Sequence, residues 1–264
     1  MSTNENKDKK AEVTALQAIS AEDRKDWISL AFVQAGICVC VPAFLLGALL
    51  AEAMPIWPAI ISGSLGYLIV VVGMVATGMI GCDLGLASCT CCQAGFGKSG
   101  ARFIVSTIFA VNMIGWFGIQ NGVCGEAFSN AMLAMTGWDI PVVVSNTIWG
   151  IIMLLTAVYG VHALEKLDKI SIPLLMIIMC YGTFLAFKVY GTGNLNDEGT
   201  VQSMSFMSGV ALSFNFTAVG TITGPDYTRF QKSRKDTVKS VFYGVFPMGV
   251  ITLIMGIVLT KLSG

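Results

Sequence analysis

The stretch GWFGIQN, Gly115 to Asn121, places an indole and two primary amides inside a run that carries no charge from Phe103 to Gly125. In a helix, Trp116 and Gln120 lie four residues apart and project from one face, with Asn112 one turn earlier on the same stripe. An indole can stack on a planar ring, and a primary amide offers both a donor and an acceptor to the edge of a heterocycle. This spacing indicates a binding face for one planar ligand with amide-like edges.

A packing role is the alternative interpretation of the same stripe. Trp116 would then lie against a neighbouring helix and Gln120 would hydrogen-bond across a helix interface, as polar side chains do in membrane bundles. The spacing alone leaves both interpretations open.

Other patterns give little support for an enzyme or a metal site. Cys89, Cys91 and Cys92 contain one C-x-x-C, but no second ligand pair and no nearby histidine complete a zinc site. The run CQAGFGKS lacks the first glycine of a phosphate-binding loop. No nucleophile and base stand out as a pair. We therefore expect neither an enzyme nor a bound cofactor.

The elements that would position these side chains are membrane spans. The chain of 264 residues is 55% apolar and only 12% charged, unlike a soluble domain. Crossing about 30 Å of hydrocarbon takes roughly 17 to 25 residues. About seven sufficiently long uncharged runs lie between consecutive charges: 27–51, 53–82, 103–125, 140–164, 170–187, 199–225 and 240–260. The sequence thus predicts an all-α integral membrane protein with the lipid bilayer as its surroundings.

The distribution of Lys and Arg predicts the orientation of these spans, because cytoplasmic loops are enriched in both. With the N-terminus inside, only Lys188 and Lys261 of the 16 basic residues fall outside. We expect a cytoplasmic tail over 1–26, a transmembrane domain over 27–264, and a location in the plasma membrane. Net charge is zero, and we expect no nucleic-acid partner.

Two of the predicted spans contain signals for a break in the helix. Pro42 lies deep in the first span, where it removes a hydrogen bond, and the sixth reads SFNFTAVGTITG where a lipid anchor would use Leu and Ile. Spans five apart run antiparallel. This arrangement is typical of inverted repeats whose broken first spans face a shared site. The first repeat would cover 27–190 and the second would begin over 199–264.

The chain resembles the nucleobase-cation-symport-1 transporters, which include cytosine, purine, hydantoin and allantoin permeases. The resemblance rests on GWFGIQ, on the loop GCDLGLASCTCCQAGFGKSG, and on GTITGPDYTRF after the sixth span. The cysteine cluster of that loop departs from the family pattern. The resemblance implies a LeuT-type fold in which a planar base is sandwiched between the third and sixth spans.

The resemblance also implies residue roles. Trp116 would stack on the base and Gln120 would hydrogen-bond it, while Phe216 and Asn215 would form the wall from the sixth span and Cys40 would border the substrate. A coupling sodium ion would take backbone carbonyls near Gly36 and Val39, and such oxygen ligands suit a hard cation. Proton coupling remains the alternative.

Family members have ten core spans, whereas this chain ends after the seventh, so we expect an incomplete LeuT-type fold. We interpret the chain as a fragment. The two alternatives are that a partner chain supplies the missing spans, or that the protein is degenerate. The leading functional hypothesis is a permease for a nucleobase, with cytosine ranked before purines, hydantoin and allantoin. The competing hypothesis is a membrane subunit that does not transport by itself.

Overall fold

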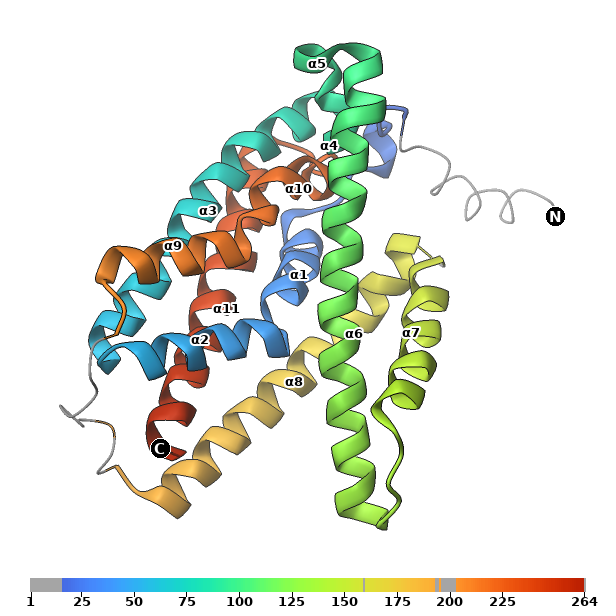
Figure 1. The fold of residues 1–264 in the computed structure, drawn as a ribbon. Coiled ribbons are helices and arrows are strands. Elements are labelled where there is room, and N and C mark those ends of the chain that lie inside the picture. The colour runs from blue at the N-terminus through green and yellow to red at the C-terminus, as the bar shows by residue number, and fades with distance from the viewer. Residues whose placement is uncertain (1–15, 159, 193–194, 196–202, 264) are drawn as a thin grey trace. The chain divides into compact units, whose positions relative to one another are not determined.

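The computed structural model describes residues 16–158, 160–192, 195 and 203–263 (Figure 1), without the side chains of 158 and 160–168. The chain divides into two compact units, and each is described by itself. The first comprises Met1–Cys91 together with Asp168–Gly264, and the second comprises Cys92–Leu167.

All regular elements of the described residues are helical, apart from one isolated β-bridge between Lys25 and Gln231. The helices of the first unit are η1 (Ala21–Asp23), α1 (Trp27–Cys38), α2 (Val41–Ala53), α3 (Ile56–Leu84), α4 (Ser88–Cys91), α9 (Phe206–Thr217), α10 (Val219–Thr228) and α11 (Arg234–Ser263). Those of the second are α5 (Gln93–Gly100), η2 (Ala101–Val105), α6 (Ser106–Thr136) and α7 (Val142–Val158). Helix α8 (Gly160–Tyr190) begins in the second unit and continues in the first.

The described helices match six of the seven predicted spans at full length. Among the described residues, five helical stretches are long and apolar enough to cross a membrane: 56–84, 93–136, 169–190, 206–228 and 234–263. The bent pair α1 and α2 makes a sixth. The remaining predicted span is α7, an apolar helix of 17 residues. At about 1.5 Å per residue it is roughly 25 Å long, slightly less than the hydrocarbon thickness.

The first span is broken, as predicted, but the break precedes the proline. Helices α1 and α2 meet at 52°, and the residues between them are extended or irregular, with φ −87° and ψ 75° at Val39 and φ −145° and ψ 157° at Cys40. Pro42 is the second residue of α2. A proline has no N–H, and the first turn of a helix does not use that donor. Pro42 therefore starts the second half of the span.

The sixth span is divided at Ala218 into α9 and α10, but far more weakly. Ala218 keeps helical angles of φ −55° and ψ −32°. Pro225 lies within α10 and cannot donate to the carbonyl four residues earlier, which belongs to Thr221. The Thr77 hydroxyl of α3 donates to that carbonyl at 2.7 Å. A neighbouring helix thus supplies the missing donor.

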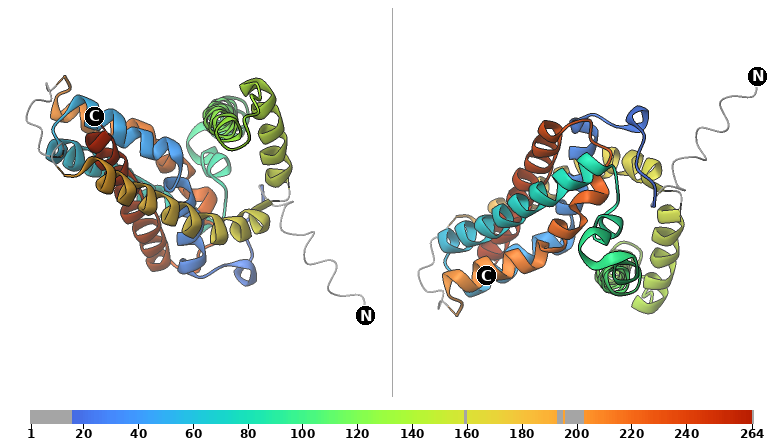
Figure 2. Two further views of the ribbon diagram at one scale, coloured as in Figure 1. Left: turned by 90° about the horizontal axis from the view of Figure 1, so that it is seen from below. Right: turned by 90° about the horizontal axis from the view of Figure 1, so that it is seen from above.

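Each divided span packs on the helix that follows the other one. Helices α1 and α2 lie against α11, while α9 and α10 lie against α3 (Figures 1 and 2). Hydroxyls join the second pair, because Ser213 donates to the Gly63 carbonyl and Thr228 to the Gly78 carbonyl, both at 2.7 Å. The main core lies among these helices, and its largest fully buried side chains include Tyr67, Leu46, Leu50, Leu253 and Ile257.

A short part of the N-terminal tail is bound to one end of this unit. The Ile19 N–H donates to the Gly85 carbonyl at 2.9 Å, and the Lys25 N–H donates to the Phe230 carbonyl at 2.6 Å. Asp26 pairs with Lys232 at 2.6 Å. These contacts join the beginning of α1 to the end of α3 and to the α10–α11 connection. The predicted tail over 1–26 therefore includes residues with fixed tertiary contacts.

Candidate functional site

The break in the first span has the chemical character that a cation site needs. Gly36 lies in the last turn of α1, and Val39 follows the helix with its side chain buried. Carbonyl groups at a helix C-terminus carry partial negative charge, and broken spans use them to coordinate cations. The Val39 N–H donates to the Ala35 carbonyl at 2.9 Å, which closes the last turn. Backbone carbonyl oxygen is the kind of ligand that a sodium ion would take at this break.

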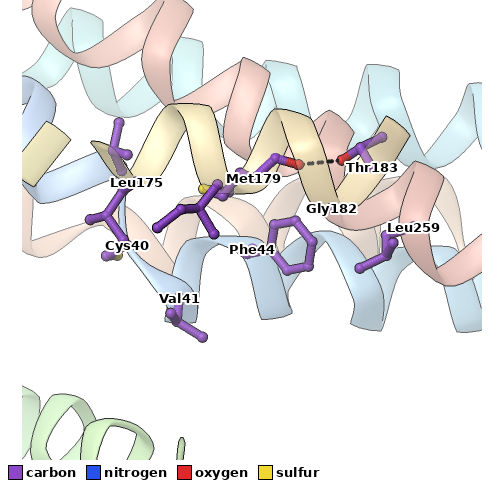
Figure 3. A pocket seen from close by; sticks show the side chains of 10 residues that line it. Cys40, Val41, Phe44, Leu175, Met179, Gly182, Thr183 and Leu259 are labelled. Atoms are coloured by element: carbon purple, nitrogen blue, oxygen red, sulfur yellow. Dashed lines mark hydrogen bonds between the residues drawn. The ribbon is translucent and has the colours of Figure 1, made fainter. Parts of the chain in front are cut away.

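An apolar pocket of about 290 Å³ opens beside this break (Figure 3). Its wall combines the start of α2 with one face of α8 and a residue of α11: Val39, Cys40, Val41, Phe44, Leu175, Ile178, Met179, Gly182, Thr183 and Leu259. The Thr183 hydroxyl donates to the Met179 carbonyl of its own helix at 2.8 Å. Cys40, a predicted substrate neighbour, lies on this wall. The pocket suits an apolar group, and the polar edge of a heterocycle would need partners from elsewhere.

The predicted wall from the sixth span lies at the end of α9. Asn215 is exposed, and Phe216 is half-buried and packs against the main core of the first unit. Both residues belong to the last turn of α9, directly before Ala218.

The predicted ligand stripe lies on a single uninterrupted helix of the second unit. Asn112, Trp116 and Gln120 all belong to α6, whose assignment has no break from Ser106 to Thr136. Asn112 is exposed, whereas Trp116 and Gln120 are half-buried. Because the helix is continuous, the four-residue spacing places these side chains on one face.

The structure thus collects the predicted site residues into three groups. Gly36, Val39 and Cys40 lie together at the break of the first span, and Asn215 and Phe216 are neighbours in α9. The ligand stripe belongs to α6, in the other compact unit.

Sequence reasoning missed two sets of polar side chains. Gln34 of α1 and Tyr67 of α3 are fully buried, and the Gln34 amide and Tyr67 hydroxyl have no hydrogen-bond partner within the described part of the chain. Gln34 lies four residues from Leu30 and from Cys38 on the buried stripe of α1, so its spacing could have revealed it. The second set is Asn121 and Asn146, which face each other between α6 and α7.

Charged groups gather outside the spans, near the α10–α11 connection. The Asp226 carboxylate accepts hydrogen bonds from the Ser88 N–H at 3.0 Å and the Ser88 hydroxyl at 2.7 Å. Burial lowers the pKa of the Arg229 guanidinium below its ordinary value, and the nearby Asp226 carboxylate opposes that shift.

Comparison with known proteins places this geometry in a family. Residues 19–264 match the family described as permeases for cytosine/purines, uracil, thiamine and allantoin. The chain is 27% identical over 237 residues to the cytosine permease of Escherichia coli K12, with 88% of this chain and 54% of that protein aligned. It is 25% identical over 247 residues to the purine-uracil permease of Arabidopsis thaliana, with 83% of this chain and 41% of that protein aligned. The chain thus spans about half the length of these relatives.

A solved structure has the same fold. It is Mhp1, a nucleobase-cation-symport-1 family transporter, in a closed conformation with bromovinylhydantoin bound. The TM-score is 0.82 at 18% sequence identity, over 91% of this chain and 56% of that one. This agreement confirms the predicted LeuT-type fold, with this chain covering part of it. With the match over residues 19–264, it follows that the chain belongs to the nucleobase-cation-symport-1 family of cytosine and purine permeases.

Proposed function

We propose that this chain forms the substrate-binding part of a nucleobase permease, with cytosine as the first substrate to test. The observation that carries the proposal is the stripe of Asn112, Trp116 and Gln120 on one face of the continuous helix α6, in a chain of this family. The related cytosine, purine-uracil and allantoin permeases are named for planar heterocycles with amide-like edges, which agrees with an indole beside a primary amide.

In this proposal, the base stacks on Trp116 and pairs with the amide of Gln120. Phe216 and Asn215 form the opposite wall, and Cys40 borders the ligand beside the break of the first span. Sodium, held by the carbonyls of Gly36 and Val39, is the first coupling ion to test, and a proton is the alternative. The protein would lie in the plasma membrane with its N-terminus in the cytoplasm, following the distribution of Lys and Arg.

The first test is uptake of radiolabelled cytosine by cells that express the 264-residue chain, and by cells that express the same chain extended through the downstream coding sequence. Uptake by either, above that of cells with an empty vector, supports a permease. Comparing the two shows whether these seven spans suffice. Absence of uptake of cytosine, uracil, hypoxanthine and allantoin by both, with each protein present in the membrane, contradicts the proposal.

The stacking role has its own test in whichever chain transports. Trp116→Ala should abolish cytosine uptake while leaving the amount of protein in the membrane unchanged. The matched control is Trp57→Ala, which removes a tryptophan that is 68% exposed at the start of α3. Normal uptake by Trp116→Ala would refute the stacking model.

A second candidate function is a membrane subunit that transports only with a partner chain. The given residues align with 54% of the Escherichia coli cytosine permease and 50% of the Bacillus subtilis allantoin permease, so their activity without further spans is tested separately. Co-expression with a separate chain that carries the remaining spans of the Escherichia coli cytosine permease would then restore uptake. The subunit interpretation is wrong if the 264-residue chain transports without it.

A further inference from the structure

Helices α6 and α7 meet through the same four-residue motif used twice. Asn121 precedes Gly125 on α6, and Asn146 precedes Gly150 on α7, each by four residues. A Cβ atom added to Gly125 would lie only 2.7 Å from the Asn146 Cγ and 2.8 Å from the Asn146 backbone nitrogen. One added to Gly150 would lie 3.2 Å from the Asn121 Nδ2. Each asparagine therefore occupies the notch that the glycine of the other helix leaves open. These four residues are called the Asn–Gly interlock below.

Polar contacts along the same seam make the arrangement specific. The Asn121 Nδ2 donates to the Asn146 carbonyl at 3.1 Å, and the Ser129 hydroxyl donates to the Ile140 carbonyl. Phe128 meets Trp149 edge to face, with ring centroids 5.5 Å apart. Any other rotation of α6 against α7 would lose these contacts and place glycines opposite the wrong side chains.

Simple helix packing does not require these residue types. The Oδ1 atoms of Asn121 and Asn146 and the Nε1 of Trp149 are buried and have no hydrogen-bond partner in the part of the chain that the structure describes. A membrane interface built only for close packing would use small or apolar residues, because unpaired polar atoms cost free energy in lipid. Buried asparagines are used elsewhere to specify the register of helix pairs at some cost in stability.

The interlock lies on the side of α6 opposite the ligand stripe. Successive residues of an α-helix turn by about 100° around its axis. Counted from Trp116, Gln120 lies at about 40°, Asn121 at about 140° and Gly125 at about 180°. The face that holds α7 therefore points away from the face that carries Trp116 and Gln120. Because α6 is continuous, turning the interlock turns the stripe by the same angle.

We propose that the Asn–Gly interlock is a positioning element, which sets the rotation of α6 relative to α7 and thereby the direction in which Trp116 and Gln120 face. Only the claim that these two side chains bind a heterocycle rests on the proposed function. The four residues of the Asn–Gly interlock touch no ligand in this proposal. They act through the orientation of α6.

A chemical test of rotation needs no transport. Gln120→Cys is introduced in the full chain, and the rate at which a maleimide labels position 120 is read by peptide mass spectrometry. Gly125→Ala should change that rate severalfold, because its new Cβ meets the Asn146 amide. Adding Asn146→Ala removes the amide but leaves the Asn146 backbone nitrogen 2.8 Å from the new Cβ, so it should restore only part of the original rate. The control is Gly122→Ala, where an added Cβ meets nothing within 4 Å.

The same three variants, without the cysteine, test the consequence for binding in a chain that transports cytosine. Gly125→Ala should raise the KM of uptake on the order of tenfold, as small misplacements of contact groups do. Vmax per membrane-inserted molecule should change little. The double variant should recover part of the lost affinity, and Gly122→Ala should match the wild type.

The outcomes separate the two proposals. Rotation and rescue in the labelling assay, without uptake of any heterocycle by the wild type, keep the interlock and refute the permease. A labelling rate unchanged by Gly125→Ala, or altered equally by Gly122→Ala, overturns the interlock. A changed labelling rate with an unchanged KM keeps the interlock and refutes the binding role of Trp116 and Gln120. If Gly125→Ala does not fold, Gly150→Ala replaces it, because its Cβ meets only side-chain atoms of Asn121. Restoration of the labelling rate by adding Asn121→Ala then supports the interlock, and no restoration contradicts it.

Discussion

The crossing of α2 and α11 gives the sharpest prediction about stability. Gly47 and Gly256 bring the two backbones into contact, so that a Cβ on Gly256 would overlap the Phe44 carbonyl oxygen and lie 3.0 Å from its carbon. A Cβ on Gly47 would lie 3.1 Å from the Gly256 Cα. Backbone atoms, unlike the end of a side chain, cannot relieve such an overlap by changing rotamer. Gly256→Ala must therefore push the helices apart.

The size of the effect follows from ordinary contact distances. Carbon atoms pack at about 3.5–4.0 Å, so the helices must separate by roughly 0.5–1 Å, which removes about a quarter to a half of the dispersion energy of each contact across the interface. The side chains affected include Leu46, Leu50, Leu253 and Ile257, all almost fully buried. Overpacking of this kind costs about 1–3 kcal/mol. We expect Gly256→Ala to lower the free energy of unfolding by that amount.

Thermal unfolding of the purified chain in detergent measures this loss. The matched control is Gly182→Ala in α8, where an added Cβ meets nothing within 4 Å and no backbone has to move. Gly256→Val should destabilise more than Gly256→Ala. Equal melting temperatures for Gly256→Ala and Gly182→Ala would refute the close crossing, and with it the idea that α11 holds the second half of the broken span in place.

Three further predictions follow from single contacts. Thr77→Val should lower the free energy of unfolding by about 0.5–1.5 kcal/mol, because the Thr221 carbonyl loses its donor. The loss should shrink in a Pro225→Ala background, where residue 225 regains a backbone N–H, and equal losses in both backgrounds would contradict that account. The Asp83–Arg234 pair is bidentate, with Nε 2.9 Å from Oδ1, but the two side chains are 39% and 67% exposed. Asp83→Asn should therefore lower the melting temperature only slightly, and by less at high salt. A large drop that does not depend on salt would be inconsistent with an exposed pair. On the proposed function, Gln120→Leu should raise the KM for cytosine on the order of tenfold or more, because an edge of the base would lose its hydrogen-bond partner. Leu133→Ala, at an exposed position of α6, should leave the KM unchanged, and matching KM values for the two variants would argue against the amide contact.

Much of the fold could be predicted from local sequence. Uncharged runs located six helical stretches long enough to span a membrane and the shorter α7, because the cost of burying a charge in hydrocarbon applies to each segment separately. The position of the first break was predicted less well. Pro42 marked the correct region, but the chain leaves helical geometry at Val39 and Cys40, and the proline begins the next helix. A proline is compatible with either position, so the sequence did not choose between them.

The shared face of the predicted site residues on α6 could also be predicted from local sequence. Residues four apart on an uninterrupted helix share a face, so the stripe of Asn112, Trp116 and Gln120 follows from spacing alone. The last residue of the same stretch, Asn121, was not predicted to have a role, because its partner Asn146 lies on another helix. Its role depends on a glycine notch that no local pattern reveals.

The amino-acid sequence by itself therefore located the apolar helices, the discontinuity of the first span and the shared face of Asn112, Trp116 and Gln120, since each depends on residues within one helix. Only the tertiary structure decided which helices cross backbone to backbone at Gly47 and Gly256, and that Thr77 supplies the hydrogen bond that Pro225 withholds from Thr221. It also decided that Asn121 fills the space beside Gly150 and that Asn146 fills the space beside Gly125. These contacts join residues far apart in the chain. Their energies depend on the distance and rotation between helices, which the order of the amino acids does not show.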